Sequence, residues 1–258
     1  MIEALKQEVL DSADRTLWIL KVMKLFYGSL DPSNFANKDS YLYFILAPIL
    51  KPLLLQDTRN RFVFGESNLK AKAVEINRYL DDDERGFAGP KIDAILIDKK
   101  YNMEIMTIEV SGPPNKINHT HFLEDRNKTA KNLKAMFKHI VSKLEDPSII
   151  SVRKLKLRGI QFYNNQAYIY SLSRPCDSYV FSLDMVFPVL GQSSILHQSI
   201  PTFVKQFSAI PWLIHETHAI LDDIFTFDKS QEILEEVNDD PSPHVSPRKK
   251  QKAKNSEE

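Results

Sequence analysis

The sequence has one cysteine, few glycines and no long apolar run, and each scarcity excludes a class of protein. The single Cys176 excludes a disulfide framework within the chain and a cysteine-cluster zinc site, and it fits a reducing compartment. The seven glycines form neither G-x-G-x-x-G nor G-x-x-x-x-G-K-S/T, so nothing indicates a nucleotide-binding loop. No run approaches the roughly 20 apolar residues of a membrane span, so we expect no membrane partner.

The chain also lacks an excess of charge of either sign. Lysine plus arginine and aspartate plus glutamate each number 34, so binding to nucleic acid requires a local basic patch. The pattern G-x-S-x-G of serine hydrolases is absent. His215 and His218 are three residues apart instead of the four of the zinc-protease motif, so we expect them to pack or to contact a partner. The N-terminal segment carries acids and no secretory signal, so we expect an intracellular protein.

What the sequence does contain is a succession of helical and strand periodicities. Helical spacing is found up to residue 30 and at 40–55, 66–80, 119–143 and 201–225. Strand patterns are found at 61–64, within 89–114, and at 153–163, 166–172 and 179–190. Pro48 and Pro52 should kink or divide the second helix, and Asn164-Asn165 suits a tight hairpin turn.

This order of elements predicts an α/β fold, with a mixed β-sheet flanked by helices. A hydrophobic content of 43% is enough to bury a core in a chain of this length. We predict a single domain over 1–231, made of a helical N-terminal part (1–60), a core (61–163) and a sheet extension with a late helix (164–231).

The segment from Gly89 to Pro114 is the most informative part of the sequence. It predicts two apolar strands joined by a turn near residues 100–101, with Asp93 in the first strand and Glu109 in the second. One register opposes Asp93 to Ile108. The other opposes Asp93 to Glu109 and brings both carboxylates onto one face, with Cβ atoms roughly 5 Å apart.

Carboxylates in the second register need a partner. Two like charges so close in an apolar hairpin repel each other unless a cation or a shared proton offsets them. Mg²⁺ prefers hard oxygen ligands and keeps several waters, so two carboxylates and a substrate phosphate can bind it. A metal held there can activate water and stabilise the charge of phosphodiester cleavage. A buried salt bridge or an exposed edge explains the same spacing, so these alternatives stay open.

The motifs around this hairpin resemble those of a known enzyme superfamily. The order of a helix with a glutamate, then G-P-K-I-D-A-I, then a strand ending in E-V-S, then a charged helix resembles the PD-(D/E)XK nucleases. More narrowly, it is similar to uncharacterised fungal proteins with divergent copies of this core, some of them linked to mobile elements. The resemblance covers roughly residues 64–143 and implies a restriction-endonuclease-like core.

The resemblance also implies a set of metal ligands. It assigns Mg²⁺ binding to Asp93, Glu109 and Glu66, with Glu75 as the alternative to Glu66. The sequence departs from the family at the lysine two residues after the glutamate, where Ser111 stands. A serine hydroxyl binds water or a phosphate oxygen but brings no positive charge.

A lysine from the next helix is the expected replacement. Some members of the superfamily supply the lysine from that helix, so the resemblance implies a catalytic role for Lys128 or Lys131. Other basic residues of this helix and of the following strand are expected to bind the phosphates of nucleic acid. These are Lys134, Lys138, Lys154, Lys156 and Arg158.

The C-terminal segment 232–258 is expected to be a disordered basic tail, because acidic and polar residues replace apolar ones there. It contains a compact basic run typical of a nuclear localisation signal or a nucleic-acid-binding arm. The run consists of Arg248, Lys249, Lys250, Lys252 and Lys254. We therefore expect binding to the nuclear import machinery and a nuclear location, and otherwise a cytoplasmic one.

Three functions compete at this point. The first is a metal-dependent nuclease that hydrolyses DNA. The second is a catalytically inactive protein of the same fold that binds nucleic acid or a protein partner in the nucleus. The third is a structural protein in which Asp93 and Glu109 are only packed and hydrogen-bonded.

Overall fold

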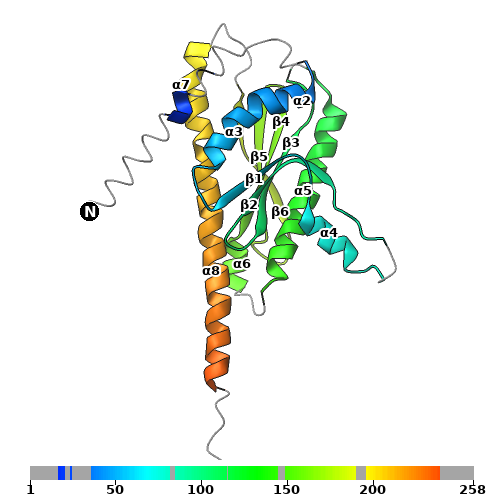
Figure 1. Cartoon of the computed structure of the whole chain (residues 1–258), viewed down its shortest axis with the longest axis vertical. Helices are drawn as coiled ribbons and strands as arrows, with labels where there is room; N and C mark the ends of the chain where they lie inside the picture. The colour runs from blue at the N-terminus through cyan, green and yellow to red at the C-terminus, as the bar shows by residue number, and fades with distance from the viewer. Residues whose placement is uncertain are drawn as a thin grey trace, which may run out of the picture.

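The computed structural model describes residues 17–20, 24, 36–81, 85–114, 116–144, 149–189 and 196–238. They form an α/β fold in which one six-stranded mixed sheet is flanked by helices, as predicted (Figure 1). Within these residues, no helix is long and apolar enough to cross a membrane.

The strands lie in the sheet in the same order as in the chain. They are β1 (Asn60–Asn68), β2 (Lys91–Asp98), β3 (Met103–Val110), β4 (Lys156–Tyr163), β5 (Gln166–Ser173) and β6 (Val180–Pro188). Every neighbouring pair is antiparallel except β3 and β4, which are parallel. A parallel pair needs a crossover connection, and helix α5 (His119–Val141) lies in it.

The predicted turns are confirmed. The β2–β3 hairpin turns between Asp98 and Met103, with Asn102 at φ 54°. The β4–β5 hairpin turns at Asn164 and Asn165, with φ of 47° and 57°. Asparagine tolerates positive φ better than most residues, which is why it occupies these positions.

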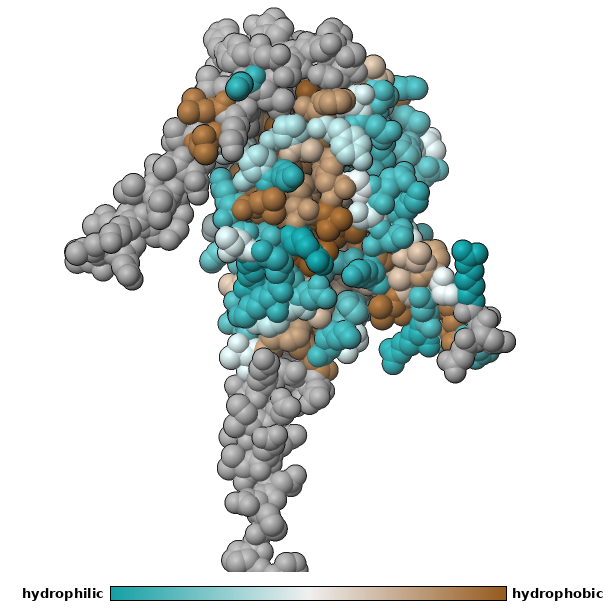
Figure 2. Space-filling model, in the orientation of Figure 1, coloured by the Kyte–Doolittle hydropathy of each residue, from teal (hydrophilic) through white to brown (hydrophobic). Residues whose placement is uncertain are grey.

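Helices cover both faces of the sheet. The α5 face carries α4 (Lys70–Asn77) and α5, and the α8 face carries α3 (Ala47–Leu54) and the long α8 (Ala209–Asn238) (Figure 1). The remaining elements are α2 (Lys38–Tyr41), the π-helical η2 (Leu42–Leu46), α6 (Ile149–Lys154) and α7 (Leu196–Phe207). The outer surface is largely hydrophilic, with hydrophobic residues gathered near the middle of the view in Figure 2, where β1 lies.

The helix predicted at 40–55 is divided, as expected, at its first proline. The N–H of Ala47 bonds to the carbonyl of Leu42, which makes the turn before Pro48 π-helical. Because Pro48 has no N–H, a regular α-helical bond is missing there in any case. Pro52 lies inside α3.

The late helix predicted at 201–225 is two helices, α7 and α8, and three further boundaries differ from those predicted. Glu66 belongs to strand β1 and not to a helix, because β1 continues past a register shift and pairs Ser67 with Ile92. Lys154 ends α6, so it is not part of the following strand. Residues 232–238 are helical, as the end of α8, and not part of a tail.

A glycine sets how closely α5 approaches the sheet. A Cβ atom on Gly159 of β4 would lie 2.5 Å from Thr129 Cγ2 and 3.3 Å from Leu133 Cδ1. A side chain there would push the helix outward. Gly159 therefore lets α5 lie directly over the parallel strands, with Asp125 and Lys128 near their carboxyl ends.

At the other end of the β2–β3 hairpin, a charged network ties the sheet to α8. Arg59 Nε donates to Asp98 Oδ2 at 2.7 Å and Nη1 donates to Asp222 Oδ2 at 2.8 Å. Lys100 Nζ and the Tyr101 hydroxyl both donate to Asp222 Oδ1, at 2.7 and 2.9 Å. We call these five residues the α8 clasp.

Candidate functional site

A row of polar side chains crosses three adjacent strands on the α5 face. The register pairs Ala94 with Ile108, and one step further it opposes Asp93 to Glu109. On the other side, Glu109 is the parallel partner of Gln161. Neighbours in such a row have Cβ atoms roughly 5 Å apart. Of the two registers left open by the sequence, the structure therefore has the one that places both acids together, and we call Asp93 and Glu109 the acid pair.

Both acids of this pair are buried, with 5% and 1% of their surface exposed. Asp93 Oδ2 accepts a hydrogen bond of 2.7 Å from the N–H of Val110, and Asp93 Oδ1 lies 2.8 Å from Lys38 Nζ. Glu109 Oε1 lies 2.8 Å from Lys128 Nζ. This ammonium is the contact of Glu109 Oε1, which accepts no hydrogen bond of regular geometry from the described residues. Each acid therefore faces a lysine ammonium, and Asp93 is held in addition by a backbone hydrogen bond.

The electrostatics of the acid pair differ from those of an ordinary salt bridge. Burial raises the pKa of Glu109 to about 7, against the opposing effect of Lys128, and the charges of Asp93 and Asp125 raise it further. Burial lowers the pKa of Lys38, but the hydrogen bond to Asp93 and the surrounding carboxylates outweigh it, so the net shift is upward. The site is therefore rich in negative charge even with two lysines present.

Ser111 belongs to a hydrogen-bonded chain beside the acid pair. Its hydroxyl donates to Asp125 Oδ2 at 2.7 Å and accepts from Gln161 Nε2, also at 2.7 Å. The Tyr170 hydroxyl in turn donates to Gln161 Oε1 at 3.3 Å. His121 Nε2 lies 3.3 Å from Asp125. Ser111 thus brings no positive charge to the site but orients Asp125, a third carboxylate supplied by α5.

The other predicted metal ligands pair with lysines, although Glu66 lies at the β1 irregularity opposite Asp93, between the pairs Phe64–Ala94 and Ser67–Ile92. Glu66 is exposed on β1 and pairs with Lys91 at 2.6 Å; this hydrogen bond lowers its pKa, helped by Lys38 and Lys128. Glu75 is on α4 and pairs with lysines of α4 and α5. In the described part of the chain, no group of three or more His, Cys, Asp or Glu side chains is placed to hold a metal ion.

The predicted basic residues separate into two groups. Lys131 and Lys134 are exposed on α5, Lys134 Nζ lies 5.0 Å from the ring centroid of Tyr179, and Lys138 further along pairs with Glu75 at 2.7 Å. Lys154 and Lys156 lie where β4 begins. Since Gln161 marks the level of the acids, Lys156 is about 16 Å away along the strand.

Arg158 differs from the other predicted phosphate-binding residues because it is buried. Its side chain is on the α8 face, where it lies 2.6 Å from Glu216 and 3.6 Å from Asp184. Two carboxylates therefore already balance its charge. The structure does not bring Arg158 together with the lysines of α5.

The two histidines of α8 have different environments. His218 is 3% exposed, with Nδ1 3.3 Å from Asp57 and Nε2 3.8 Å from Asp98. Burial lowers its pKa, and Arg59 adds to that effect. His218 is therefore a packed residue beside the α8 clasp, whereas His215 is exposed.

Two residues of the site were missed at the level of sequence. Lys38 stands in a short helix far from the hairpin, and no local pattern points to it. Gln161 could have been found from the sequence. It is a polar side chain between Ile160 and Phe162, in a strand buried on both faces. A polar residue at such a position is hydrogen-bonded to another buried group, which directs attention to the site.

No family model matches the chain, and no curated protein or solved structure matches it significantly.

Proposed function

We propose that this protein is a metal-dependent nuclease that hydrolyses phosphodiester bonds of DNA, built on a restriction-endonuclease-like core. The observation that carries the proposal is the position of Lys128. Its Nζ, on the helix after β3, lies 2.8 Å from Glu109 Oε1. A cation thus stands beside the glutamate although the position two residues later is Ser111. The antiparallel β2–β3 hairpin, followed by a helix and a parallel β4, supports the same proposal.

The donor set fits a hard divalent cation. Asp93 and Glu109 are neighbouring carboxylates, and each would exchange one lysine contact, Lys38 and Lys128 respectively, for the ion. Mg²⁺ needs only one or two protein carboxylates when waters and a substrate phosphate complete its shell. Asp93 and Glu109 would hold the ion, which in place supplies a Lewis acid for water activation and phosphate polarisation.

The chain's own residues have separate roles in the proposed reaction. Lys128 neutralises charge on the phosphate oxygens as the attacking water adds. Lys131, exposed about one turn along α5 from Lys128, binds a neighbouring phosphate of the strand. Asp125, held by Ser111, accepts a hydrogen bond from a water at the site.

A catalytically inactive protein that binds nucleic acid is the second candidate, and Lys38 favours it. Its ammonium lies 2.8 Å from Asp93 Oδ1, on an oxygen that the metal would use. If this pair persists when DNA and Mg²⁺ are present, the acids serve only to hold α2 and α5 to the sheet. The site then binds phosphates without cleaving them.

A cleavage assay separates the two candidates. We expect the protein to nick plasmid and cut single-stranded DNA in Mg²⁺ or Mn²⁺, and Asp93→Ala and Glu109→Ala to abolish cleavage. Asp177→Ala, an exposed acid in the loop between β5 and β6, is the matched control and should cleave normally. Absence of cleavage by the wild type, or cleavage that survives both changes, rejects the nuclease.

The role of Lys128 needs its own comparison. Lys128→Ala should lower the cleavage rate about 100-fold or more, since removing one positioned charge-stabilising group has effects of that order. Lys143→Ala, an exposed lysine beyond the end of α5, is the control. Titration calorimetry with Mn²⁺ then tests metal binding by Asp93→Ala, which should bind the ion more weakly than the wild type.

We also propose that the basic run Arg248 to Lys254 directs the protein to the nucleus. This run lies outside the described residues, so the proposal rests on composition alone. Deletion of 248–254 from a fluorescent fusion should move the fusion to the cytoplasm. An unchanged nuclear signal contradicts the proposal.

A further inference from the structure

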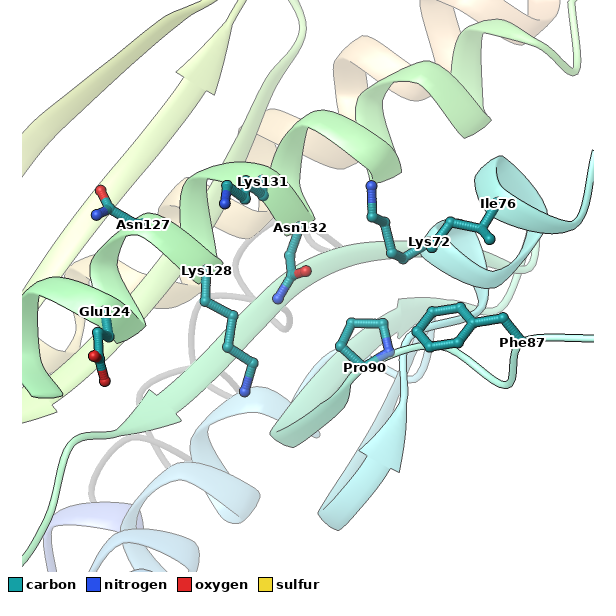
Figure 3. Close-up of a pocket in the computed structure, with 9 residues that line it drawn as sticks. All are labelled: Lys72, Ile76, Phe87, Pro90, Glu124, Asn127, Lys128, Lys131 and Asn132. Atoms are coloured by element: carbon teal, nitrogen blue, oxygen red, sulfur yellow. The ribbon is translucent and has the colours of Figure 1, made fainter. Parts of the chain in front are cut away.

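A hollow of about 420 Å³ opens beside the acid pair, between α4, the segment before β2, and α5 (Figure 3). One wall is apolar and consists of Ile76, Phe87 and Pro90. The other wall is polar and comes from α5. Its volume is within the range of roughly 300–1,000 Å³ typical of small-ligand sites. The surface around α4 is also one of the places where hydrophobic residues gather in Figure 2.

The apolar wall carries an exposed aromatic ring on an anchored stretch of backbone. Phe87 is 41% exposed, yet its N–H donates to Asn77 Oδ1 at 2.7 Å and its carbonyl accepts from Asn77 Nδ2 at 3.0 Å. The segment is also anchored after the phenylalanine. The N–H of Leu69 donates to the carbonyl of Pro90 at 3.0 Å, and Gly89 has φ of +94° with room for no side chain against Leu69. The backbone that carries Phe87 is therefore held in place, with its ring at the wall of the hollow.

The polar wall contains a hydrogen-bond donor without an acceptor. Asn132 is 2% exposed, and its Nδ2 has no hydrogen-bond partner in the described part of the chain. In Figure 3 its amide points away from α5, toward the space between Lys128 and Pro90. An unpaired buried donor costs free energy, so a ligand with a carbonyl or ring nitrogen there would satisfy it.

The lysines of the polar wall link this hollow to the acid pair. Lys128 lines the hollow and its Nζ lies 2.8 Å from Glu109. Lys131 also lines it, is exposed, and makes no ion pair with any described residue. A ligand that fits this arrangement has a flat ring to stack on Phe87, an acceptor for Asn132, and phosphates for the lysines.

We infer that the hollow binds the base of an unpaired nucleotide whose neighbouring phosphate is held at the acid pair. The inference deepens the proposed function and rests on it for the position of the phosphate. A base inside a duplex is stacked and paired, and it reaches such a hollow only after unpairing, which costs a few kcal/mol. The preferred substrate is therefore single-stranded or locally unpaired DNA.

Binding without cleavage gives the direct test. A short single-stranded oligonucleotide containing 2-aminopurine is titrated with the full chain in Ca²⁺, which takes the same hard oxygen ligands but demands no octahedral geometry. We expect the fluorescence to fall as the base stacks on Phe87. Phe87→Ala should weaken binding by about 5- to 150-fold, the range that loss of one base–aromatic stack produces. Tyr79→Ala is the matched control, because Tyr79 is 82% exposed near the end of α4 and does not line the hollow.

A second variant covers the polar wall. Asn132→Leu keeps the size of the side chain and removes its donor, and it should weaken binding of the labelled strand while leaving the thermal unfolding midpoint unchanged or higher. The same oligonucleotide in a perfect duplex should bind more weakly and show no quenching. If Phe87→Ala and Asn132→Leu bind the single strand as tightly as Tyr79→Ala does, the inference is overturned.

The two proposals fail in different ways. A protein that quenches the labelled strand through Phe87 but never cleaves DNA keeps the base site and loses the nuclease. A protein that cleaves DNA through Asp93 and Glu109 but is indifferent to Phe87→Ala keeps the nuclease and loses the base site.

Discussion

The two ends of strand β2 carry two buried acids with opposite characters. At one end, Asp98 belongs to the α8 clasp, where both oxygens accept hydrogen bonds: Oδ1 from the N–H groups of Lys100 and Tyr101, and Oδ2 from Arg59. At the other end, Asp93 stands beside Glu109, whose Oε1 lies 2.8 Å from Lys128 Nζ without a hydrogen bond of regular geometry. Asp98 is therefore held by three hydrogen bonds, whereas Glu109 Oε1 contacts an ammonium.

The ionisation of the two networks follows from this difference. In the clasp, hydrogen bonds from Arg59, Lys100 and Tyr101 outweigh burial and lower the pKa of Asp222 well below its usual range. In the acid pair, burial outweighs Lys128 and raises the pKa of Glu109 to about 7. Folding favours the charged form of Asp222, as expected of a structural ion pair. Folding disfavours the charged form of Glu109, which is typical of carboxylates in functional sites.

Removing Asp98 from the α8 clasp should have the largest effect on the free energy of unfolding. Asp98→Ala removes a fully buried carboxylate and leaves Arg59 and two N–H groups without it. We expect the free energy of unfolding to fall by about 3–5 kcal/mol, the usual cost of removing one partner of a buried pair. Urea unfolding followed by circular dichroism measures this. A loss below about 1 kcal/mol would mean that the clasp is no more than a surface contact.

Neutralising Glu109 should instead stabilise the protein at a pH above its raised pKa. Folding raises the pKa of Glu109 from 4.5 to about 7, so the folded state binds its proton more tightly than the unfolded chain does. Stability therefore falls as the pH rises from about 4.5 to 7, by about 3 kcal/mol in total. Glu109→Gln should raise the free energy of unfolding by about that much at pH 8 and leave it unchanged near pH 4.5. Equal effects at both pH values contradict this account.

The chain around Ser111 should show an intermediate effect. Ser111→Ala removes the donor to Asp125 Oδ2 and the acceptor of Gln161 Nε2, both buried. We expect a loss of about 1–3 kcal/mol in unfolding free energy. Ser111→Cys keeps a weak donor and should recover part of it. If Ser111→Ala is neutral, water replaces the hydroxyl and the chain is not a rigid support of Asp125.

Glu66 provides the smallest and most selective test. It is exposed and pairs with an equally exposed Lys91, so Glu66→Gln should leave the unfolding midpoint unchanged. Because Glu66 is engaged in an exposed ion pair with Lys91, we also expect that Mn²⁺ affinity, measured by calorimetry, does not change. A clear loss of Mn²⁺ affinity would show that Glu66 leaves Lys91 and binds the ion.

The parts of this fold that sequence could predict are those with a local signal. The period of two along residues 92–97 and 105–111 limited Asp93 and Glu109 to two registers, one of which puts both on one face, because alternation is intrinsic to a strand. The asparagine pair at 164–165 predicted its hairpin for a similarly local reason. The helix after the hairpin was predicted from its apolar stripe, which brought Lys128 into consideration.

The parts that could not be predicted depend on tertiary pairing. The segment after Gly65 has helical composition, but pairing of Ser67 with β2 keeps it extended past a glycine at φ +92°, so Glu66 was assigned to the wrong element. Arg158 was grouped with lysines that share its strand, and only α8, packed against the other face, reveals its carboxylate partners. The partner of Asp93, Lys38, has no signal in its own segment.

The strand order has a consequence for how the molecule folds. Each strand pairs with its neighbour in the chain, so the β2–β3 hairpin needs only a short loop closure, whereas β3–β4 pairing must wait for α5 to dock. Asp93 and Glu109 therefore meet before Lys128 arrives. Their repulsion should slow this step at pH 8 and much less below about pH 4.5, the ordinary pKa of Glu109 before burial raises it, so the acids that define the site also slow its assembly. Stopped-flow refolding of Glu109→Gln, which lacks that repulsion, should be faster than the wild type at pH 8 alone.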